Sequence, residues 1–304
     1  ADEFIDTFKT VCVPLAWRDI EPAESQYAWE ASDKLLAWAE ANQLRVIAGP
    51  LIDFSGAGLP DWLSLWEGDI PNLANFMCDY VETIIHRYGS RIRRWHLTTG
   101  ANLSQFLNLN EDETLFLTAK LAETALHKEP SLELVIGVAQ PWGEYLAREE
   151  YTYTPLVFLD QLLRAGLRLA AIDVELIAGV SPRGSYCRDL LEVYRLLEHY
   201  SELGVPIQLT LGYPASTEAD AHAYSKHEIS AGRWREGYTP DVQAEWAEQV
   251  ATLALSRTYV SGVHWTHFSD ADKHRYPNCG IVDANNQVKP ALVRLSRLRA
   301  RHLN

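Results

Sequence analysis

Residues 133–177 decide the fold, and they read ELVIGVAQPWGEYLAREEYTYTPLVFLDQLLRAGLRLAAIDVELI. A β-rich run (133–139) is followed by a stretch with helical periodicity (155–166) and then by a second β-rich run (170–177). Two strands joined through a helix form a βαβ unit, and the strands of such a unit are parallel. The stretch therefore predicts two neighbouring strands of a parallel sheet.

The same alternation of strand and helix extends in both directions. Further β-rich runs lie at 10–15, 45–52, 94–99, 206–211 and 262–267. Helical patterns lie near 32–42, 71–88, 111–128, 186–203, 240–257 and 288–302. This repetition predicts an α/β fold of the (β/α)8 TIM barrel type. With 304 residues, 47% of them hydrophobic, the chain is long enough to form one such barrel as a single domain spanning 1–304.

The sequence gives seven clear strands where a complete barrel has eight. The missing first strand has two possible places. It lies either in residues 1–8, which have a poor strand pattern, or upstream of this sequence. We expect the second, a barrel truncated at its N-terminus.

The formal net charge of −14 limits the partners that the protein can have. An acidic surface repels nucleic acids and anionic membranes, so we expect neither as a partner. No apolar run reaches the roughly 20 residues of a membrane span. No signal peptide is visible at the start, which leaves the compartment open, and no pattern indicates an oligomeric state.

The four cysteines are Cys12, Cys78, Cys187 and Cys279. None is part of a Cys-x-x-Cys pair, so no zinc motif exists, and we expect four thiols that are mostly buried. A disulfide between Cys187 and Cys279, both just beyond strand ends, is the less favoured alternative.

Three segments carry a family resemblance. They are Trp17-Arg18-Asp19-Ile20-Glu21-Pro22 with Asp33-Lys34-Leu35-Leu36-Ala37-Trp38-Ala39 after it, Gly49-Pro50-Leu51 with Leu59-Pro60-Asp61-Trp62-Leu63, and Gly280-Ile281-Val282-Asp283 with Lys289-Pro290-Ala291-Leu292. In this order they resemble the motifs of the family 10 glycoside hydrolases, the endo-β-1,4-xylanases, and Tyr88 and Trp95 fall where that family has "R-Y … W". The resemblance covers nearly the whole chain and implies a barrel that acts on a β-linked polysaccharide or oligosaccharide. Function still depends on the site itself.

The site departs from the pattern of that family. The resemblance places Gly100 at the acid/base glutamate after the fourth strand, and Leu211 at the nucleophile of the seventh. It also places Ala16 at an active-site lysine and Pro50 at a histidine. Retaining hydrolysis needs two carboxyl groups, which Gly100 and Leu211 do not supply. We therefore expect the family's own chemistry to be absent.

Other acids lie where barrel enzymes keep their catalytic groups, at the C-terminal ends of strands. Asp173 and Glu175 alternate with apolar residues on one strand, so both point into the mouth of the barrel. Two acids in a confined site raise one pKa, which suits a general acid. The favoured catalytic pair is Glu175 with Glu144. The competing interpretation is that each acid is neutralised by a basic residue or exposed to solvent, and it is preferred for Asp173 and for Glu144.

The residues expected to bind substrate surround this pair. Gln140 and Trp142 follow the fifth strand, Trp265 and Asp270 belong to the last strand and its loop, and Tyr213 and Asn102 complete the set. An indole beside a carboxylate is suited to stacking on a sugar ring, although Trp265 also fits a buried packing role. Asp53 and Asp270 are reserve carboxylates.

A metal site is an alternative with a weaker basis, and the sequence predicts no cofactor. Asp220, His222, His227 and Glu228 lie in the long stretch 213–239, and His264 and His267 lie nearby on the last strand. Histidine and carboxylate ligands suit Zn²⁺, but no recognised ligand spacing is present, so solvated histidines are favoured. Stretch 181–185 resembles an anion-binding helix start, yet it fits a simple helix-initiating turn better.

Three functions follow from these observations. The first is a carbohydrate-active hydrolase with relocated carboxylates, and the second is a non-catalytic barrel that binds glycans in the same cleft. The third is metal-dependent chemistry. The first two are separated by one geometric question, which is whether two cleft carboxyl groups face each other across a gap of roughly 5–10 Å.

Overall fold

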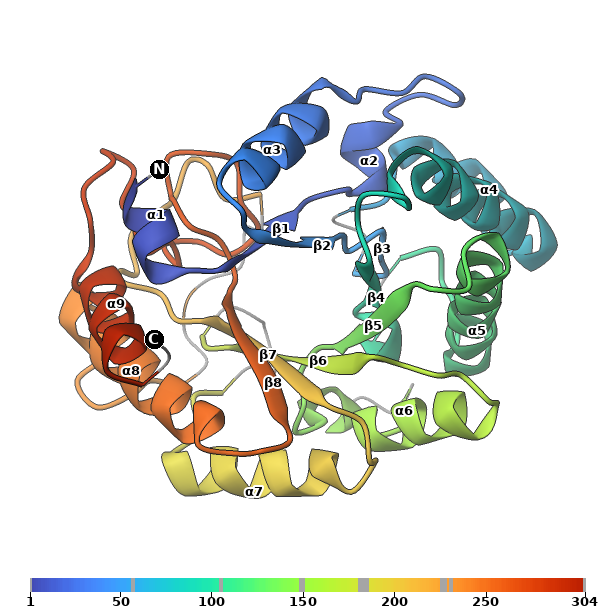
Figure 1. Ribbon diagram of the computed structural model, residues 1–304. Helices are drawn as coiled ribbons and strands as arrows, with labels where there is room; N and C mark the ends of the chain where they lie inside the picture. The colour runs from blue at the N-terminus through green and yellow to red at the C-terminus, as the bar shows by residue number, and fades with distance from the viewer. Residues whose placement is uncertain are drawn as a thin grey trace. The chain divides into compact units, whose positions relative to one another are not determined.

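The computed structural model describes residues 2–55, 58–103, 106–147, 151–179, 186–224, 229 and 232–302 (Figure 1). The chain forms two compact units. Unit 1 comprises Ala1–Phe8, Gln140–Ala147 and Asp173–Asn304, and unit 2 comprises Lys9–Ala139 and Arg148–Ile172.

Unit 2 contains five parallel strands: β1 (Thr10–Val13), β2 (Arg45–Ala48), β3 (Ile52–Asp53), β4 (Arg94–Thr99) and β5 (Glu133–Val138). β1 pairs with β2, both β2 and β3 pair with β4, and β4 pairs with β5. Its helices are α2 (Trp17–Ile20), α3 (Glu30–Ala41), α4 (Ile70–Tyr88), α5 (Glu111–Lys128) and α6 (Pro155–Arg164), and its 3-10 turns are η1 (Asp61–Trp66) and η2 (Ala101–Leu103).

Unit 1 contains the remaining strands: β6 (Ala171–Ile177), which begins in unit 2, β7 (Ile207–Gly212) and β8 (Val260–Trp265). β7 pairs with β8 in parallel. The helical elements are α1 (Asp2–Thr7), η3 (Glu144–Ala147), α7 (Leu190–Ser201), α8 (Pro240–Leu255) and α9 (Pro290–His302).

Parallel strands that alternate with helices define the (β/α)-barrel class, as predicted. Because β2 and β3 both pair with β4, the strands among the described residues occupy seven places in the sheet, the predicted number. The predicted strand 45–52 is interrupted at Gly49-Pro50. Gly49 has a positive φ of 111°, and a side chain there would meet the His96 carbonyl oxygen, so only glycine fits.

Residues 1–8 do not form the missing strand. Residues 2–7 form helix α1, and the phenylalanines of this segment pack in unit 1. Phe8 packs on a core of Ala244, Ile281, Val282, Ala291 and Leu292. The less favoured alternative, a poorly formed first strand in residues 1–8, is therefore wrong, because the apolar residues of this segment serve a helix face.

Side chains that cap the helices fix where those helices begin. Asn110 and Glu113 form a capping box at the start of α5, and Thr154 and Thr239 cap α6 and α8, each followed by proline. These residues satisfy backbone N–H groups that lack helical partners. The helices consequently begin close to the predicted positions.

Two further expectations concern the whole chain. None of the four cysteines, all within the described residues, forms a disulfide, so the alternative Cys187–Cys279 bridge is not made. Cys12 is exposed and only Cys279 is fully buried, so the thiols are less buried than expected. Within the described ranges, no helix has the length and apolar character to span a bilayer.

Candidate functional site

Asp173 is the most buried acid of the candidate site. It lies on β6 with 3% of its surface exposed, and the Thr210 hydroxyl on β7 lies 3.0 and 2.8 Å from its two carboxylate oxygens. Burial, reinforced by the negative charge of Glu175, raises the pKa of Asp173 to about 8, although the Thr210 hydrogen bond lowers it. Asp173 is therefore mainly protonated at neutral pH.

Glu175 follows two residues later on the same face of β6. The Tyr276 hydroxyl donates to its Oε2 at 3.2 Å. Tyr276 packs on Ile177 and Cys279, and the Arg275 guanidinium lies 4.8 Å from its ring centroid. The segment after β8 therefore holds the Glu175 carboxylate in place.

The partner of Asp173 corrects the predicted register of β7. Because Thr210 faces Asp173, alternation turns Leu211 to the opposite face of the sheet, where it is fully buried. An inward catalytic position on this strand would be Thr210 or Gly212, and not Leu211 as inferred from the resemblance. The whole strand, Ile207–Gly212, contains no acid, so the lack of a carboxylate on β7 does not depend on the register.

In unit 2, the end of β4 is equally free of acids. Arg94–Thr99 is followed by Gly100, with a φ of 66°, and then by η2, and no Asp or Glu lies in this stretch. Asn102, an expected substrate contact, is instead engaged with the backbone of Ala139. Its Nδ2 donates to the Ala139 oxygen at 2.8 Å, and its Oδ1 accepts from the Ala139 N–H at 3.1 Å. The Asn102 amide thus fastens η2 to the end of β5.

The carboxylate of Asp53, a reserve acid at the end of β3, is held close to its own backbone. Its Oδ1 accepts a hydrogen bond from the Ser55 N–H at 2.9 Å, and the residue is buried. Asp53 thus shapes the turn that follows its strand.

The segment after β5 carries Gln140, Trp142 and Glu144. Gln140 is buried, with a positive φ of 47°, and Trp142 is partly exposed. Glu144, expected as a catalytic acid or an exposed one, has only 8% of its side chain exposed and forms an ion pair with Arg188, Nη2 to Oε1, at 3.3 Å. Glu144 is therefore neutralised, which disfavours its predicted catalytic role.

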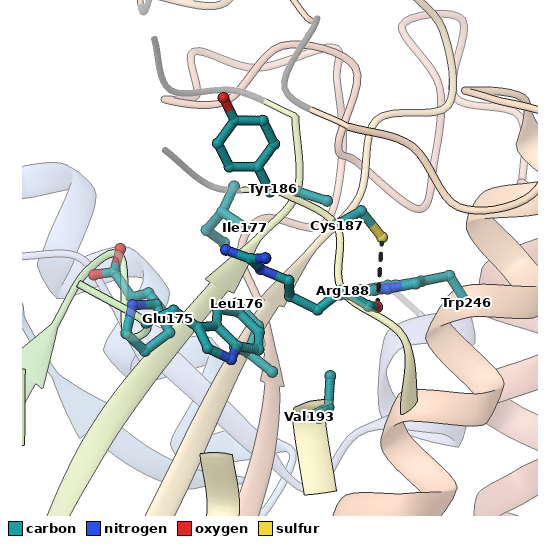
Figure 2. A pocket seen from close by; sticks show the side chains of 11 residues that line it. Glu175, Leu176, Ile177, Tyr186, Cys187, Arg188, Val193 and Trp246 are labelled. Carbon is teal, nitrogen blue, oxygen red and sulfur yellow. Dashed lines mark hydrogen bonds between the residues drawn. The ribbon is translucent and has the colours of Figure 1, made fainter. Parts of the chain in front are cut away.

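A small pocket lies beside this ion pair (Figure 2). It is lined by Pro141, Trp142, the residues Glu175 to Ala178, Tyr186 to Arg188, Val193 and Trp246. Its volume is about 20 Å³, enough for about one water molecule. In Figure 2 the Arg188 guanidinium points away from Trp246, and the Glu175 carboxylate lies apart from this guanidinium. A sugar ring would therefore have to contact the outer surfaces of these side chains.

Two predicted sugar contacts serve packing instead. The Trp265 indole donates to the Cys279 oxygen at 2.7 Å and meets Trp246 edge to face. Tyr213 has no exposed surface, and its hydroxyl donates to the Gly237 oxygen at 2.9 Å and accepts from the Trp234 N–H at 2.9 Å. Tyr213 thus anchors the stretch Trp234–Gly237 rather than a ligand.

Asp270, another predicted contact, is the centre of a buried network. Its carboxylate accepts from Lys289 Nζ at 2.6 Å and from the Gly280 N–H at 2.7 Å, and lies 3.0 Å from His267 Nε2. Burial alone would raise the pKa of Asp270, but the hydrogen bonds from His267 and Lys289 and their charges lower it to about 2. This carboxylate joins β8 and the start of α9, which leaves it little capacity to bind a ligand.

The possible metal site overlaps the predicted set only at His267, because Asp270 and His274 were not part of that set. His267, Asp270 and His274 place one possible ligand atom each within 4.8 Å of one another. His274 Nε2 already lies 2.8 Å from Asp220 Oδ2 and its Nδ1 2.8 Å from the Asp272 oxygen, while Lys289 occupies Asp270. These hydrogen bonds would compete with a metal ion.

Other members of the predicted metal set lie apart from this trio. The His222 ring contacts the backbone oxygen of Asp270, through Nδ1 at 3.0 Å, and not its carboxylate. His264 is on β8 and is not part of the trio. His227, Glu228 and the stretch 181–185 are outside the described residues.

Sequence reasoning missed three residues of the site, Thr210, Tyr276 and Arg188. Each is recognised only through its partner, and those partners are 37, 101 and 44 residues away along the chain. β-strand alternation alone could have identified Thr210, because it fixes the inward face of β7. No sequence signal marks the other two.

The fold is a (β/α)-barrel with acids near the end of β6, and comparisons with known proteins show which barrels it is similar to. The model of glycosyl hydrolase family 10 matches residues 12–99. Xylanase 10B from Thermotoga maritima has a TM-score of 0.69 at 18% identity, with 95% of this chain and 86% of that chain covered. Xylanase 10B from Thermotoga petrophila RKU-1, in complex with xylobiose, has a TM-score of 0.71 at 17% identity, with 100% and 90% covered.

Xylanase B from Clostridium stercorarium F9 gives a TM-score of 0.67 at 14% identity, with 97% of this chain and 98% of that chain covered. At these identities the structural likeness establishes the fold. The predicted resemblance to family 10 is thus confirmed in sequence over 12–99 and in fold over almost the whole chain. The chain is thus similar to the family 10 glycoside hydrolases in part of its sequence and shares their fold.

Proposed function

We propose that this protein binds a β-linked oligosaccharide at the face of unit 1 that carries Glu175, Tyr276 and Trp142. The observation that carries the proposal is the Glu175 carboxylate at the C-terminal end of β6, held by the Tyr276 hydroxyl. In a barrel this end of the strands is where ligands bind. A fixed carboxylate accepts hydrogen bonds from sugar hydroxyls, and an indole offers a face for stacking.

The proposed function is recognition without the retaining hydrolysis of family 10. That chemistry needs two carboxyl groups about 5–5.5 Å apart that flank the scissile bond. β4 and β7 carry no acid, and Glu144 is neutralised by Arg188. None of these positions therefore supplies a second catalytic carboxyl to Glu175, which is itself buried with 8% of its surface exposed.

Hydrolysis is the second candidate, and one observation favours it. Asp173, with its pKa raised to about 8, holds a proton at neutral pH beside Glu175, which is the division of roles that acid and base catalysis requires. Its burial against Thr210 makes direct contact with a glycosidic oxygen difficult. For this reason binding is preferred.

The test measures binding and turnover on the same samples. Xylohexaose and cellohexaose are titrated into the protein by calorimetry, and a panel of aryl glycosides and β-linked polysaccharides is assayed for hydrolysis. We expect binding of one hexaose that weakens about tenfold or more in Glu175→Gln, since a charged hydrogen bond is lost. Glu192→Gln, an acid on α7 paired only at the surface with Arg195, is the matched control and should bind normally.

Each result separates the two candidates. Binding without turnover supports recognition. Turnover that falls at least about 10²-fold in Glu175→Gln, and also in Asp173→Asn, establishes hydrolysis instead. If the wild-type protein neither binds nor cleaves any of these sugars, the proposed function is wrong.

A further inference from the structure

Arg188 lies at the meeting point of the pocket and the segment after β5. It precedes α7, and its guanidinium lies 5.6 Å from the Trp142 ring centroid and 5.7 Å from that of Tyr186. The same guanidinium pairs with Glu144. One side chain therefore contacts both an expected sugar platform and an expected acid.

The ion pair is looser than a structural salt bridge of this kind usually is. A side-on arginine–carboxylate pair has two parallel hydrogen bonds of about 2.7–2.9 Å. Here a single contact of 3.3 Å is made, while Arg188 Nε and Glu144 Oε2 are both buried and have no hydrogen-bond partner among the described residues. The ion pair is thus one of three contacts of the Arg188 guanidinium, together with those to the Trp142 and Tyr186 rings.

We infer that Arg188 is a positioning residue for saccharide binding: it holds the Trp142 indole in orientation and neutralises Glu144, so that the segment after β5 presents an uncharged aromatic face. The inference rests on the proposed function. A planar guanidinium stacks on aromatic rings, whereas the ammonium of lysine is a compact, strongly hydrated charge. Lysine should therefore keep the neutralisation but lose the orientation.

Four variants separate the two actions of Arg188: Arg188→Lys, Arg188→Gln, Glu144→Gln and the double variant Arg188→Gln/Glu144→Gln. Arg188→Gln alone leaves a buried, unpaired carboxylate and should destabilise the protein. The double variant removes that charge and should recover stability. Its affinity for xylohexaose should stay about five- to tenfold weaker than that of the wild type, and Arg188→Lys should show the same loss at normal stability.

A ligand-free measurement reports directly on the Trp142 indole. The acrylamide quenching of Trp142 is obtained by subtracting the signal of Trp142→Phe, in the wild-type and in the Arg188→Lys background. We expect quenching to increase in the lysine background, because the indole loses the guanidinium that lies 5.6 Å from its ring centroid. Arg195→Lys, on the exposed part of α7, is the control and should leave quenching and affinity unchanged.

The outcomes distinguish this inference from the proposed function. If the wild type binds the hexaose and Arg188→Lys or the double variant binds it equally well, the positioning role is refuted while saccharide binding stands. Unchanged quenching of Trp142 in the lysine background refutes it as well. If the wild type binds no oligosaccharide, both proposals fall together.

Discussion

Asp173 shows how the fold controls the charge of a single residue. Its pKa of about 8 lies above the ordinary value of 3.8, so between these pH values the folded protein binds a proton that the unfolded chain releases. The contribution of this group to stability is thus greatest at low pH and is lost as the pH rises toward 8. At neutral pH the buried Asp173 therefore lowers the free energy of unfolding relative to its contribution at low pH.

Replacement of Asp173 by asparagine should remove this pH dependence. The asparagine amide would still accept from Thr210 but would carry no titrating proton. We expect Asp173→Asn to gain stability over the wild type by up to about 1.4 kcal/mol for each pH unit between about 4 and 8. Urea unfolding at pH 5 and pH 8 measures the difference, and Glu236→Gln, which replaces an exposed acid and keeps Asp173, is the control variant. Equal slopes for Asp173→Asn and the wild type would contradict the raised pKa.

The buried pair of Lys289 and Asp270 gives a second prediction at this scale. Loss of one partner leaves an uncompensated buried charge, so Lys289→Met should lower the free energy of unfolding by about 3–5 kcal/mol. Lys34→Met breaks a pair of similar length with Glu30 whose side chains are largely exposed, and it should cost about 0.5 kcal/mol or less. Chemical denaturation compares the two. Similar losses would show that burial of the Asp270 network does not matter.

Strands β4 and β5 meet closely at Gly137. A side chain added there would lie 2.5 Å from His96 Nε2 and 2.9 Å from Thr99 Oγ1, both closer than real contacts allow. We expect Gly137→Val to destabilise the protein by about 1–3 kcal/mol through overpacking. The additional change His96→Ala should recover part of this loss by making room. Gly166→Ala, where no atom lies within 4 Å, separates crowding from simple loss of a glycine, although its positive φ adds some strain.

Elements were predicted well where their signals are local. The runs that became β4, β5 and β6 differ from the structure by at most one residue at each end, because apolar, β-branched runs bounded by polar turns determine them. Gly49-Pro50 was included in a strand because the periodicity continues across it, whereas the need for a positive φ depends on the neighbouring His96. Residues 186–189 lack the helical conformation that the pattern implied, because α7 begins only after its Asp189 cap.

The candidate site was predicted only in part, for a reason that belongs to the whole molecule. Strand ends identified Glu175 and Asp173, since alternation fixes their face. The ion pair of Glu144 is made with Arg188, and the hydrogen bond to Glu175 comes from Tyr276. Both partners are distant in the chain and belong to no sequence pattern. Tyr213 and Asn102 look like ligand contacts in a sequence because the backbone groups that engage them are not visible there.

Within unit 1, α1 packs beside α9 (Figure 1). Phe4 meets Phe268 at 5.3 Å between ring centroids, and Arg299 donates to the Ile5 and Asp6 oxygens at 3.2 and 2.7 Å. Deletion of residues 1–8 should therefore speed hydrogen exchange in α9 and cost about 2–4 kcal/mol of stability. Phe116→Ala, which removes an exposed ring on α5, should leave exchange in α9 unchanged. Normal exchange in the deleted protein would show that α1 is dispensable.

The contact of α1 with α9 also means that the order of the segments in the gene can be changed without changing the fold. A short linker from α9 to α1 would join the two helices covalently, because Arg299 on α9 already contacts the Ile5 and Asp6 carbonyl oxygens of α1. New ends could then be opened between Pro130 and Ser131, which are exposed in the turn before β5. Such a circular permutant would make β5 its first strand and keep every side-chain contact described for Glu175 and Arg188.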